Sequence, residues 1–199
     1  GEAALSGAGG GGATVLVLGV ESAHHPVDGE LALLVDIARD HGGTPAAPED
    51  RSASGGGRDH AAEAWRSSFL RMPYTRDGLA RMSAIVETFE TACTWDRVEE
   101  LYHDVRTAMG EAIRTVTGAD GLVNCRFTHV YPDGAAPYFT VIAAGRRGDE
   151  VRMWDEIKVA AMDVLGRHRA TVTHHHAVGR DHRPGYDKQR PDVFAAALT

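Results

Sequence analysis

The chain has 199 residues, of which 43% are hydrophobic, enough for one domain with a sizeable core. Its formal net charge of -7 and the lack of a basic stripe argue against a nucleic-acid or anionic-membrane partner. The sequence shows no apolar run of membrane-spanning length and no signal peptide. Its two cysteines, Cys93 and Cys125, lie in apolar or strand-like runs. We therefore expect a soluble, cytoplasmic protein with reduced core cysteines.

The N-terminal part of the chain predicts a flexible lead-in, a strand and a helix. Residues 1–13 contain a run of four glycines, but no helix follows at the spacing of a dinucleotide fingerprint, so we expect no phosphate loop. Residues 14–20 (TVLVLGV) form a continuously apolar run that is typical of a buried strand. After Pro26, apolar residues recur at helical spacing until Gly42 and Gly43, which end the predicted helix.

The middle of the chain predicts a loop, a strand and the clearest helix of the sequence. Residues 44–59 are rich in Pro, Ser and Gly and indicate a mobile loop rather than a domain boundary. A helix is expected over residues 60–66, with less regular structure over 67–74, and a strand over 84–91. The next helix begins after Thr94, a good N-cap, and ends at Gly118. Its apolar stripe comprises Val98, Leu101, Tyr102, Val105, Met109, Ala112, Ile113 and Val116.

A β-hairpin, a long helix and a short strand are expected to follow. Residues 122–131 alternate between an apolar face and a polar face that holds Asn124, Arg126 and Thr128. Pro132-Asp133-Gly134 is a turn signal, and residues 138–143 form the returning strand.

A helix is then predicted over residues 150–165, a strand over 170–173 and a closing helix over 187–198. The order of elements predicts an α+β fold with ferredoxin-like character, in which an antiparallel or mixed sheet is flanked by helices on one face.

The run His174-His175-His176 is the most unusual feature of the sequence. Imidazoles in such a run can hydrogen-bond, carry protons or bind a metal near neutral pH. The plain alternative is a solvated loop that happens to be rich in histidine. Adjacent histidines project in different directions, unlike the i, i+4 pair of a helical zinc site, and apart from Asp181 no nearby carboxylate or cysteine has ligand spacing. We therefore expect no metal here.

Arg126 and Tyr138 are the other two candidate site residues. A guanidinium pairs with a phosphate or carboxylate through two hydrogen bonds, so Arg126 is a candidate anion site, although a solvent-exposed arginine is the commoner case. Both residues have even numbers, so they share a face if the hairpin pairs positions whose numbers have an even sum. The alternative for Tyr138 is a buried structural tyrosine. The histidine run follows a further predicted strand, which can bring it to the same edge of the sheet.

Several short motifs fall in order along the chain from Thr14 onward. In chain order, they are residues 87–97 (ETFETACTWDR), Cys125-Arg126, Tyr131, Tyr138-Phe139 and residues 171–180 (TVTHHHAVGR). With compatible spacings, they resemble the alkyldihydroxyacetonephosphate synthases of the FAD-linked oxidase family, which has the vanillyl-alcohol-oxidase-type fold. The resemblance implies that residues 14–199 are the C-terminal, substrate-binding cap domain. The family's FAD-binding domain is expected to be absent from this chain.

The resemblance also implies a chemistry. These flavoproteins are transferases of ether lipid biosynthesis, which exchange the acyl group of acyl-dihydroxyacetone phosphate for a fatty alcohol. Carried over by motif, Arg126 would hold the substrate phosphate, Tyr138 would move a proton, and His174, His175 and His176 would support proton transfer. FAD would be bound non-covalently, mainly by the flavin-binding domain. The implied partners of the complete protein include a membrane surface and a second copy in a homodimer.

Two other classes of function stay open. An FAD-dependent oxidase or dehydrogenase of a 2-hydroxy acid would use Arg126 to hold a carboxylate and a histidine to accept the hydroxyl proton. A detached cap that serves only as a binding module would be non-catalytic. Activity is therefore expected of the complete protein rather than of this chain alone.

Overall fold

The computed structural model describes residues 16–45 and 60–198. The chain divides into two compact units, residues 1–73 and 74–199. The predicted lead-in, residues 1–13, and most of the predicted loop, residues 46–59, lie outside the described residues. Among the residues that are described, no helix is both long and apolar enough to cross a membrane.

The N-terminal unit contains one confirmed helix and one wrong prediction. Helix α2, Asp28–Asp40, forms where the apolar periodicity predicts it, and Gly42 follows it with φ of 83°. The predicted strand is wrong for residues 16–20, which have no regular structure and leave Leu16 67% exposed. An apolar run becomes a buried strand only where a partner strand and a packed face exist, and the described residues provide neither for it.

Helix α3, His60–Arg81, is longer than predicted. It runs for 22 residues with Pro73 inside it, so the irregular structure expected over residues 67–74 is wrong. A proline in a helix interior removes one backbone donor and kinks or breaks many helices. Here the residues on both sides include strong helix formers such as Leu70, Arg71 and Leu79, and the helix continues.

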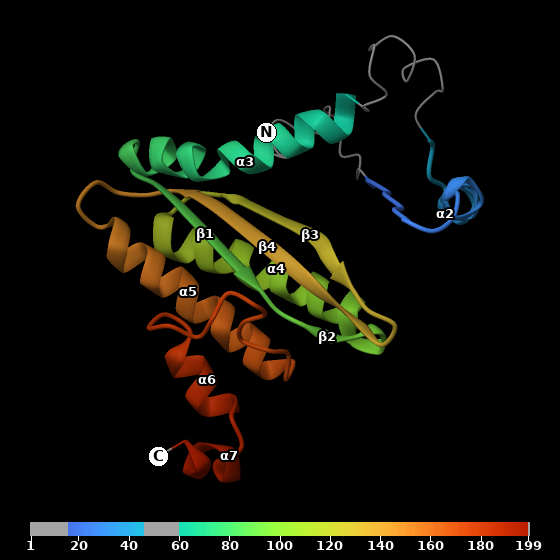
Figure 1. Ribbon diagram of the computed structural model, residues 1–199. Helices are drawn as coiled ribbons and strands as arrows, with labels where there is room; N and C mark the ends of the chain where they lie inside the picture. Colours follow the sequence, from blue (N-terminus) through green and yellow to red (C-terminus); the bar gives the residue numbers. More distant parts are fainter. Residues whose placement is uncertain (1–15, 46–59, 199) are drawn as a thin grey trace. The chain divides into compact units, whose positions relative to one another are not determined.

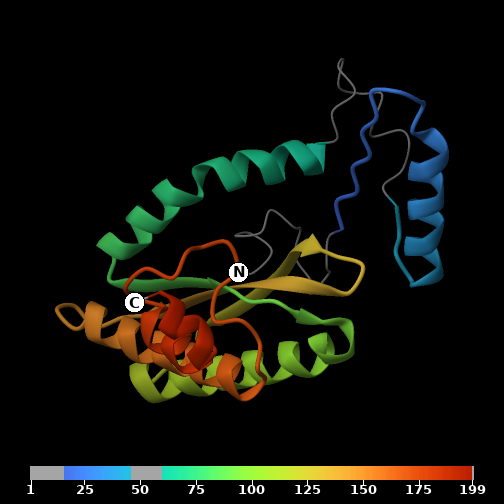
Figure 2. The same cartoon turned by 60° about the horizontal axis from the view of Figure 1, so that its bottom comes forward.

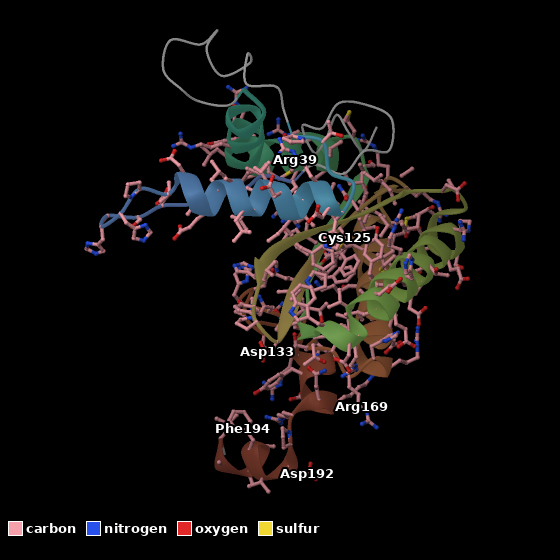
Figure 3. All side chains as sticks on the ribbon, turned by 90° about the vertical axis from the view of Figure 1, so that its right-hand side faces the viewer. Arg39, Cys125, Asp133, Arg169, Asp192 and Phe194 are labelled. Atoms are coloured by element: carbon pink, nitrogen blue, oxygen red, sulfur yellow. The ribbon has the colours of Figure 1, made fainter. Side chains whose placement is uncertain are left out.

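The C-terminal unit is built on an antiparallel sheet centred on β4. This strand, Gly134–Ala144, pairs with β1 (Ala84–Glu90), β2 (Cys93–Thr94) and β3 (Leu122–Val130). The predicted hairpin is therefore confirmed, and Asp133 lies in its turn (Figure 3). Each pairing is antiparallel, which confirms the α+β class with an antiparallel sheet.

Two long helices cover one face of this sheet (Figures 1 and 2). Helix α4, Trp95–Thr117, begins after Thr94 and ends at Gly118 with φ of 78°, and α5 spans Glu150–Arg167. Both helices were predicted. The core between the sheet and the two helices consists of buried apolar side chains, the largest of which are Phe89, Phe139, Leu101, Met109, Ile113, Met153, Ile157 and Leu165.

A buried ion pair joins α5 to β1 within this core. Lys158 and Trp154 both donate hydrogen bonds to the carboxylate of Glu87, and Lys158 and Glu87 are almost completely buried. Such a pair withstands burial only because each charge is compensated by a partner. The ion pair shows that the side chain of Glu87 points from β1 toward α5. The neighbouring side chains of β1, which alternate with it, point to the opposite face of the sheet.

The predicted strand over residues 170–173 is wrong. The segment runs beside the end of β1 and is joined to it by both backbone and side-chain hydrogen bonds. The Thr171 amide donates to the Ala92 carbonyl oxygen at 3.3 Å, Thr91 Oγ1 donates to the Thr171 carbonyl oxygen at 2.6 Å, and the Ala92 amide donates to Thr171 Oγ1 at 3.1 Å. Because the Thr171 hydroxyl, rather than a backbone carbonyl, accepts from the Ala92 amide, the pairing does not extend into a regular ladder. Within the described residues, the ferredoxin-like order of strands and helices therefore lacks its last strand after α5.

The closing helix predicted over residues 187–198 is two helices instead. Helix α6 spans Arg183–Gln189 and α7 spans Asp192–Ala197. Arg190, which precedes Pro191, has an extended backbone with ψ of 137°. The ring of a proline disfavours helical backbone in the residue before it, and this effect separates the two helices.

Both cysteines are free and half-buried, as expected of reduced residues. Burial raises the pKa of the Cys125 thiol to about 12, and burial also raises the pKa of the Cys93 thiol. Neither group supplies a thiolate readily near neutral pH, so neither is a candidate nucleophile.

Candidate active site

Three neighbouring strands present polar side chains in one row. In the register of the sheet, Tyr138 of β4 lies opposite Glu90 of β1 on one side and opposite Arg126 of β3 on the other. Side chains alternate along a strand, and the odd-numbered neighbours Phe89, Phe139 and Cys125 belong to the core packing. The row therefore lies on the sheet face opposite α4 and α5, which we call the polar face.

Arg126 and Tyr138 contact each other on the polar face. The Arg126 Cζ atom lies 4.2 Å from the centroid of the Tyr138 ring, a cation–π arrangement. Both side chains are half-buried. The predicted shared face is confirmed, and neither the fully exposed arginine nor the fully buried tyrosine is observed. The side chain of Thr128, predicted for the same face, is not among those described.

A β-bulge adds His129 to the polar face. Phe127 pairs with Pro137, whereas His129 pairs with Ala136, so one residue of β3 has no partner. The extra residue reverses the alternation and turns His129 to the side of Arg126. Its Nδ1 atom lies 3.0 Å from Glu90 Oε1. His129 was not predicted from the sequence, although Pro137 was a signal, because prolines within sheets occur mainly at edges and bulges.

The histidine run folds back over the same row. The His174 amide donates to the Glu90 carbonyl oxygen at 3.1 Å, and the His176 amide donates to the His174 carbonyl oxygen at 2.7 Å. His175 and Ala177 have φ of 44° and 62°. Left-handed backbone is costly for residues other than glycine, and it often occurs at functional sites.

Glu90 is the centre on which the run converges. It is 0% exposed, and its Oε2 atom lies 2.7 Å from His175 Nδ1, 3.5 Å from His174 Nδ1 and 3.6 Å from His176 Nε2. Sequence reasoning missed Glu90 as well. A glutamate at the end of a strand is usually solvated, whereas here the returning loop folds over it.

The run also contacts Tyr138. The rings of Tyr138 and His176 have centroids 5.3 Å apart and are tilted by 75° to one another. Burial lowers the pKa of His176. The positive charges of His175, His182 and Lys158 also lower this pKa, whereas the carboxylate of Glu90 raises it. An imidazole that is neutral near pH 7 can accept a proton. Arg126, Tyr138 and His176 thus form one continuous line of contacts.

These groups have the chemistry to bind an anion and to carry protons. Arg126 offers a fixed positive charge, while Tyr138 and the histidines are groups that can take up and release protons. The fold and the candidate site together define a class: an antiparallel sheet with helices on one face and a row of polar, titratable side chains on the other.

Comparison with known proteins gives the family. Residues 5–199 match the family described as FAD linked oxidases, C-terminal domain, and the chain belongs to this family. Alkyldihydroxyacetonephosphate synthase of Trypanosoma brucei brucei is 27% identical over 120 residues, which cover 60% of this chain and 19% of the relative. The synthase of Caenorhabditis elegans is 33% identical over 128 residues, which cover 63% of this chain and 21% of the relative.

Solved structures agree with the fold. One alkyldihydroxyacetonephosphate synthase structure matches with a TM-score of 0.59 at 18% identity, over 83% of this chain and 28% of that chain. A second matches with a TM-score of 0.53 at 18% identity, over 73% and 23%. The resemblance seen in the motifs is confirmed. The chain spans about a fifth of the length of the curated relatives that it matches.

Proposed function

We propose that this chain is the substrate-binding and catalytic cap of an FAD-dependent enzyme similar to alkyldihydroxyacetonephosphate synthase. The observation that supports the proposal most strongly is the line of contacts from Arg126 through Tyr138 to His176 on the polar face. Residues 14–199 form the cap in this proposal, and another domain holds most of the FAD. Polar groups that sit on one wall suit a surface that a second domain closes over.

The reaction is an exchange that leaves the flavin without net reduction. The bond between the dihydroxyacetone phosphate carbon and the acyl oxygen breaks, and the fatty acid leaves. A bond forms from the same carbon to the oxygen of a fatty alcohol, whose proton is released. When bound, the flavin supplies the reactive ring that the substrate carbon meets.

The residues of this chain bind the substrate and carry protons. Arg126 pairs with the substrate phosphate through its planar fork, which the ring of Tyr138 holds in place. As a phenolate, the Tyr138 side chain takes a proton from the reacting carbon and returns it there. The histidine run, His174 to His176, supports this transfer and positions the substrate. A homodimer and docking on a membrane surface remain predictions for the complete protein.

The exchange reaction itself tests the proposal. The complete flavoprotein, given acyl-dihydroxyacetone phosphate and a labelled fatty alcohol, should form ether product and free fatty acid in equal amounts. A dye that accepts electrons should stay oxidised during turnover, because the exchange transfers no net electrons. Reduction of the dye by a 2-hydroxy acid, without ether formation, would establish the oxidase or dehydrogenase alternative. A protein that does neither would be a binding module.

A further inference from the structure

Four side chains around Glu90 place metal-binding atoms close together. One ring nitrogen from each of His129, His174 and His175 and one carboxylate oxygen of Glu90 all lie within 4.8 Å of one another. These atoms come from β1, from the bulge in β3 and from the loop that follows α5. Three imidazole nitrogens and one carboxylate oxygen form a complete set of ligands for a four-coordinate ion.

The distances between the ligand atoms fit a small ion. Ligands about 2.0–2.1 Å from a tetrahedral zinc ion lie about 3.3–3.4 Å apart. His174 Nδ1 and His175 Nδ1 are 3.1 Å apart, Glu90 Oε1 and His129 Nδ1 are 3.0 Å apart, and Glu90 Oε2 and His174 Nδ1 are 3.5 Å apart. These pairs, two of which involve different oxygens of the Glu90 carboxylate, need shifts of a few tenths of an ångström around an ion. The pair of His175 Nδ1 and Glu90 Oε2, which are 2.7 Å apart, needs a larger shift.

The loop backbone explains how adjacent histidines reach one point. We expected no metal from the sequence because neighbouring side chains of a run diverge. The left-handed conformation of His175, with φ of 44°, turns its ring so that the Nδ1 atoms of His174 and His175 converge. Left-handed backbone at a residue other than glycine costs free energy and is found mainly at functional sites.

One of these imidazoles also has an outer partner. The second ring nitrogen of His174, Nε2, lies 3.2 Å from the hydroxyl of Tyr131. A hydrogen bond in which Nε2–H donates to this hydroxyl leaves Nδ1 unprotonated and directed at the cluster. Histidines that bind metals commonly have such a partner, because it fixes both the tautomer and the orientation of the ring.

We propose that the chain binds one divalent transition-metal ion of the zinc class through Glu90, His129, His174 and His175. Imidazole and carboxylate ligands suit such ions, and the absence of a thiolate disfavours monovalent copper. The ion would bind without flavin or substrate, so the proposal stands apart from the proposed function. As ligands, His174 and His175 would support proton transfer only while no ion is bound, and Arg126, Tyr138 and His176 keep the roles given above.

Metal binding can be measured directly. The complete protein is freed of metal with a chelator and titrated with Zn²⁺ by calorimetry, and with Co²⁺ by the visible absorption of tetrahedral cobalt. One equivalent should bind per chain. His129→Gln removes a ligand from a side chain that is 41% exposed, and it should weaken binding by more than the roughly tenfold expected from Tyr131→Phe, which removes only an outer partner.

A matched control separates this cluster from a second one. His168, whose side chain is 12% exposed, lies beside the exposed Asp104 and Glu100, so His168→Gln should leave the metal affinity of the Glu90 cluster unchanged. Should His129→Gln fail to fold, as judged by its thermal transition, His175→Asn provides the same test, because asparagine tolerates left-handed backbone.

Three results would overturn the proposal. The first is that the protein binds no stoichiometric metal ion. The second is that His168→Gln abolishes the binding. The third is that His129→Gln binds metal as the wild type does, which would mean that the histidine run alone captures the ion. Retained exchange activity in metal-free protein would leave the metal site standing, whereas stoichiometric binding without exchange activity would reject only the proposed function.

Discussion

Replacing Tyr138 with phenylalanine is expected to lower the turnover number of the complete flavoprotein by about 10²–10⁴-fold, the usual contribution of a positioned proton carrier. The substitution removes one hydroxyl group and keeps the ring. The contacts of that ring with Arg126 and His176 should therefore survive. Steady-state assays of ether formation give the loss, and the flavin absorbance of the purified variant shows whether the cofactor stays bound.

Tyr186→Phe is the matched control for this experiment. Tyr186 is also half-buried and contacts an arginine, Arg190, whose Cζ lies 5.9 Å from the centroid of its ring, but it belongs to α6. Its variant should keep wild-type turnover. Full turnover by Tyr138→Phe would show that the hydroxyl carries no proton and would remove Tyr138 from the mechanism.

Arg126→Lys should weaken binding of the phosphate substrate by about 2–5 kcal/mol, although the charge is preserved. A lysine ammonium cannot make two parallel hydrogen bonds to one phosphate, and it does not stack flat on the Tyr138 ring. Substrate binding is measured from KM and by direct titration. Inorganic phosphate should also compete with the substrate in the wild-type enzyme and compete less well in the variant.

The chain offers a close control for this substitution. Arg106 of α4 also stacks on a tyrosine, with its Cζ 5.4 Å from the Tyr102 centroid, but it lies on a helix rather than on the polar face. Arg106→Lys should leave KM unchanged. Equal KM values for Arg126→Lys and the wild type would indicate that Arg126 binds no substrate phosphate.

The parts of the fold that depend on local pattern were predictable. Strict alternation over residues 122–131, followed by Pro132-Asp133-Gly134, predicted the β3–β4 hairpin. The even numbers of Arg126 and Tyr138 predicted that they share a face. Helix α4 was predictable because its apolar stripe, its N-cap position and its terminal glycine all agree.

The centre of the site depends on long-range contacts and was not predictable in the same way. Glu90 is buried where a loop more than 80 residues later in the chain folds over it and where His129 of β3 contacts its carboxylate. His129 reaches the polar face through a bulge that reverses the alternation of β3. A single shifted residue in a strand exchanges its two faces, so a reading based on strict alternation fails beyond that point.

Wrong predictions elsewhere have a similar cause. The apolar run over residues 16–20 has the composition of a strand, but composition does not provide a partner strand. Residues 170–173 lie beside the end of β1, yet the Thr171 hydroxyl, rather than a backbone carbonyl, accepts from the Ala92 amide, and the backbone pairing does not extend into a regular strand. In both segments the hydrogen-bonding partner, and not the propensity of the segment, decides the outcome.

The claim that Arg126 and Tyr138 act on one substrate is tested most directly by combining Arg126→Lys with Tyr138→Phe. The values of kcat/KM for the wild type, the two single variants and the double variant form a thermodynamic cycle. Residues in contact at one site usually show a coupling free energy of about 0.5–3 kcal/mol, so the double variant should lose less than the product of the two single losses. A double variant whose loss equals that product would contradict the shared site.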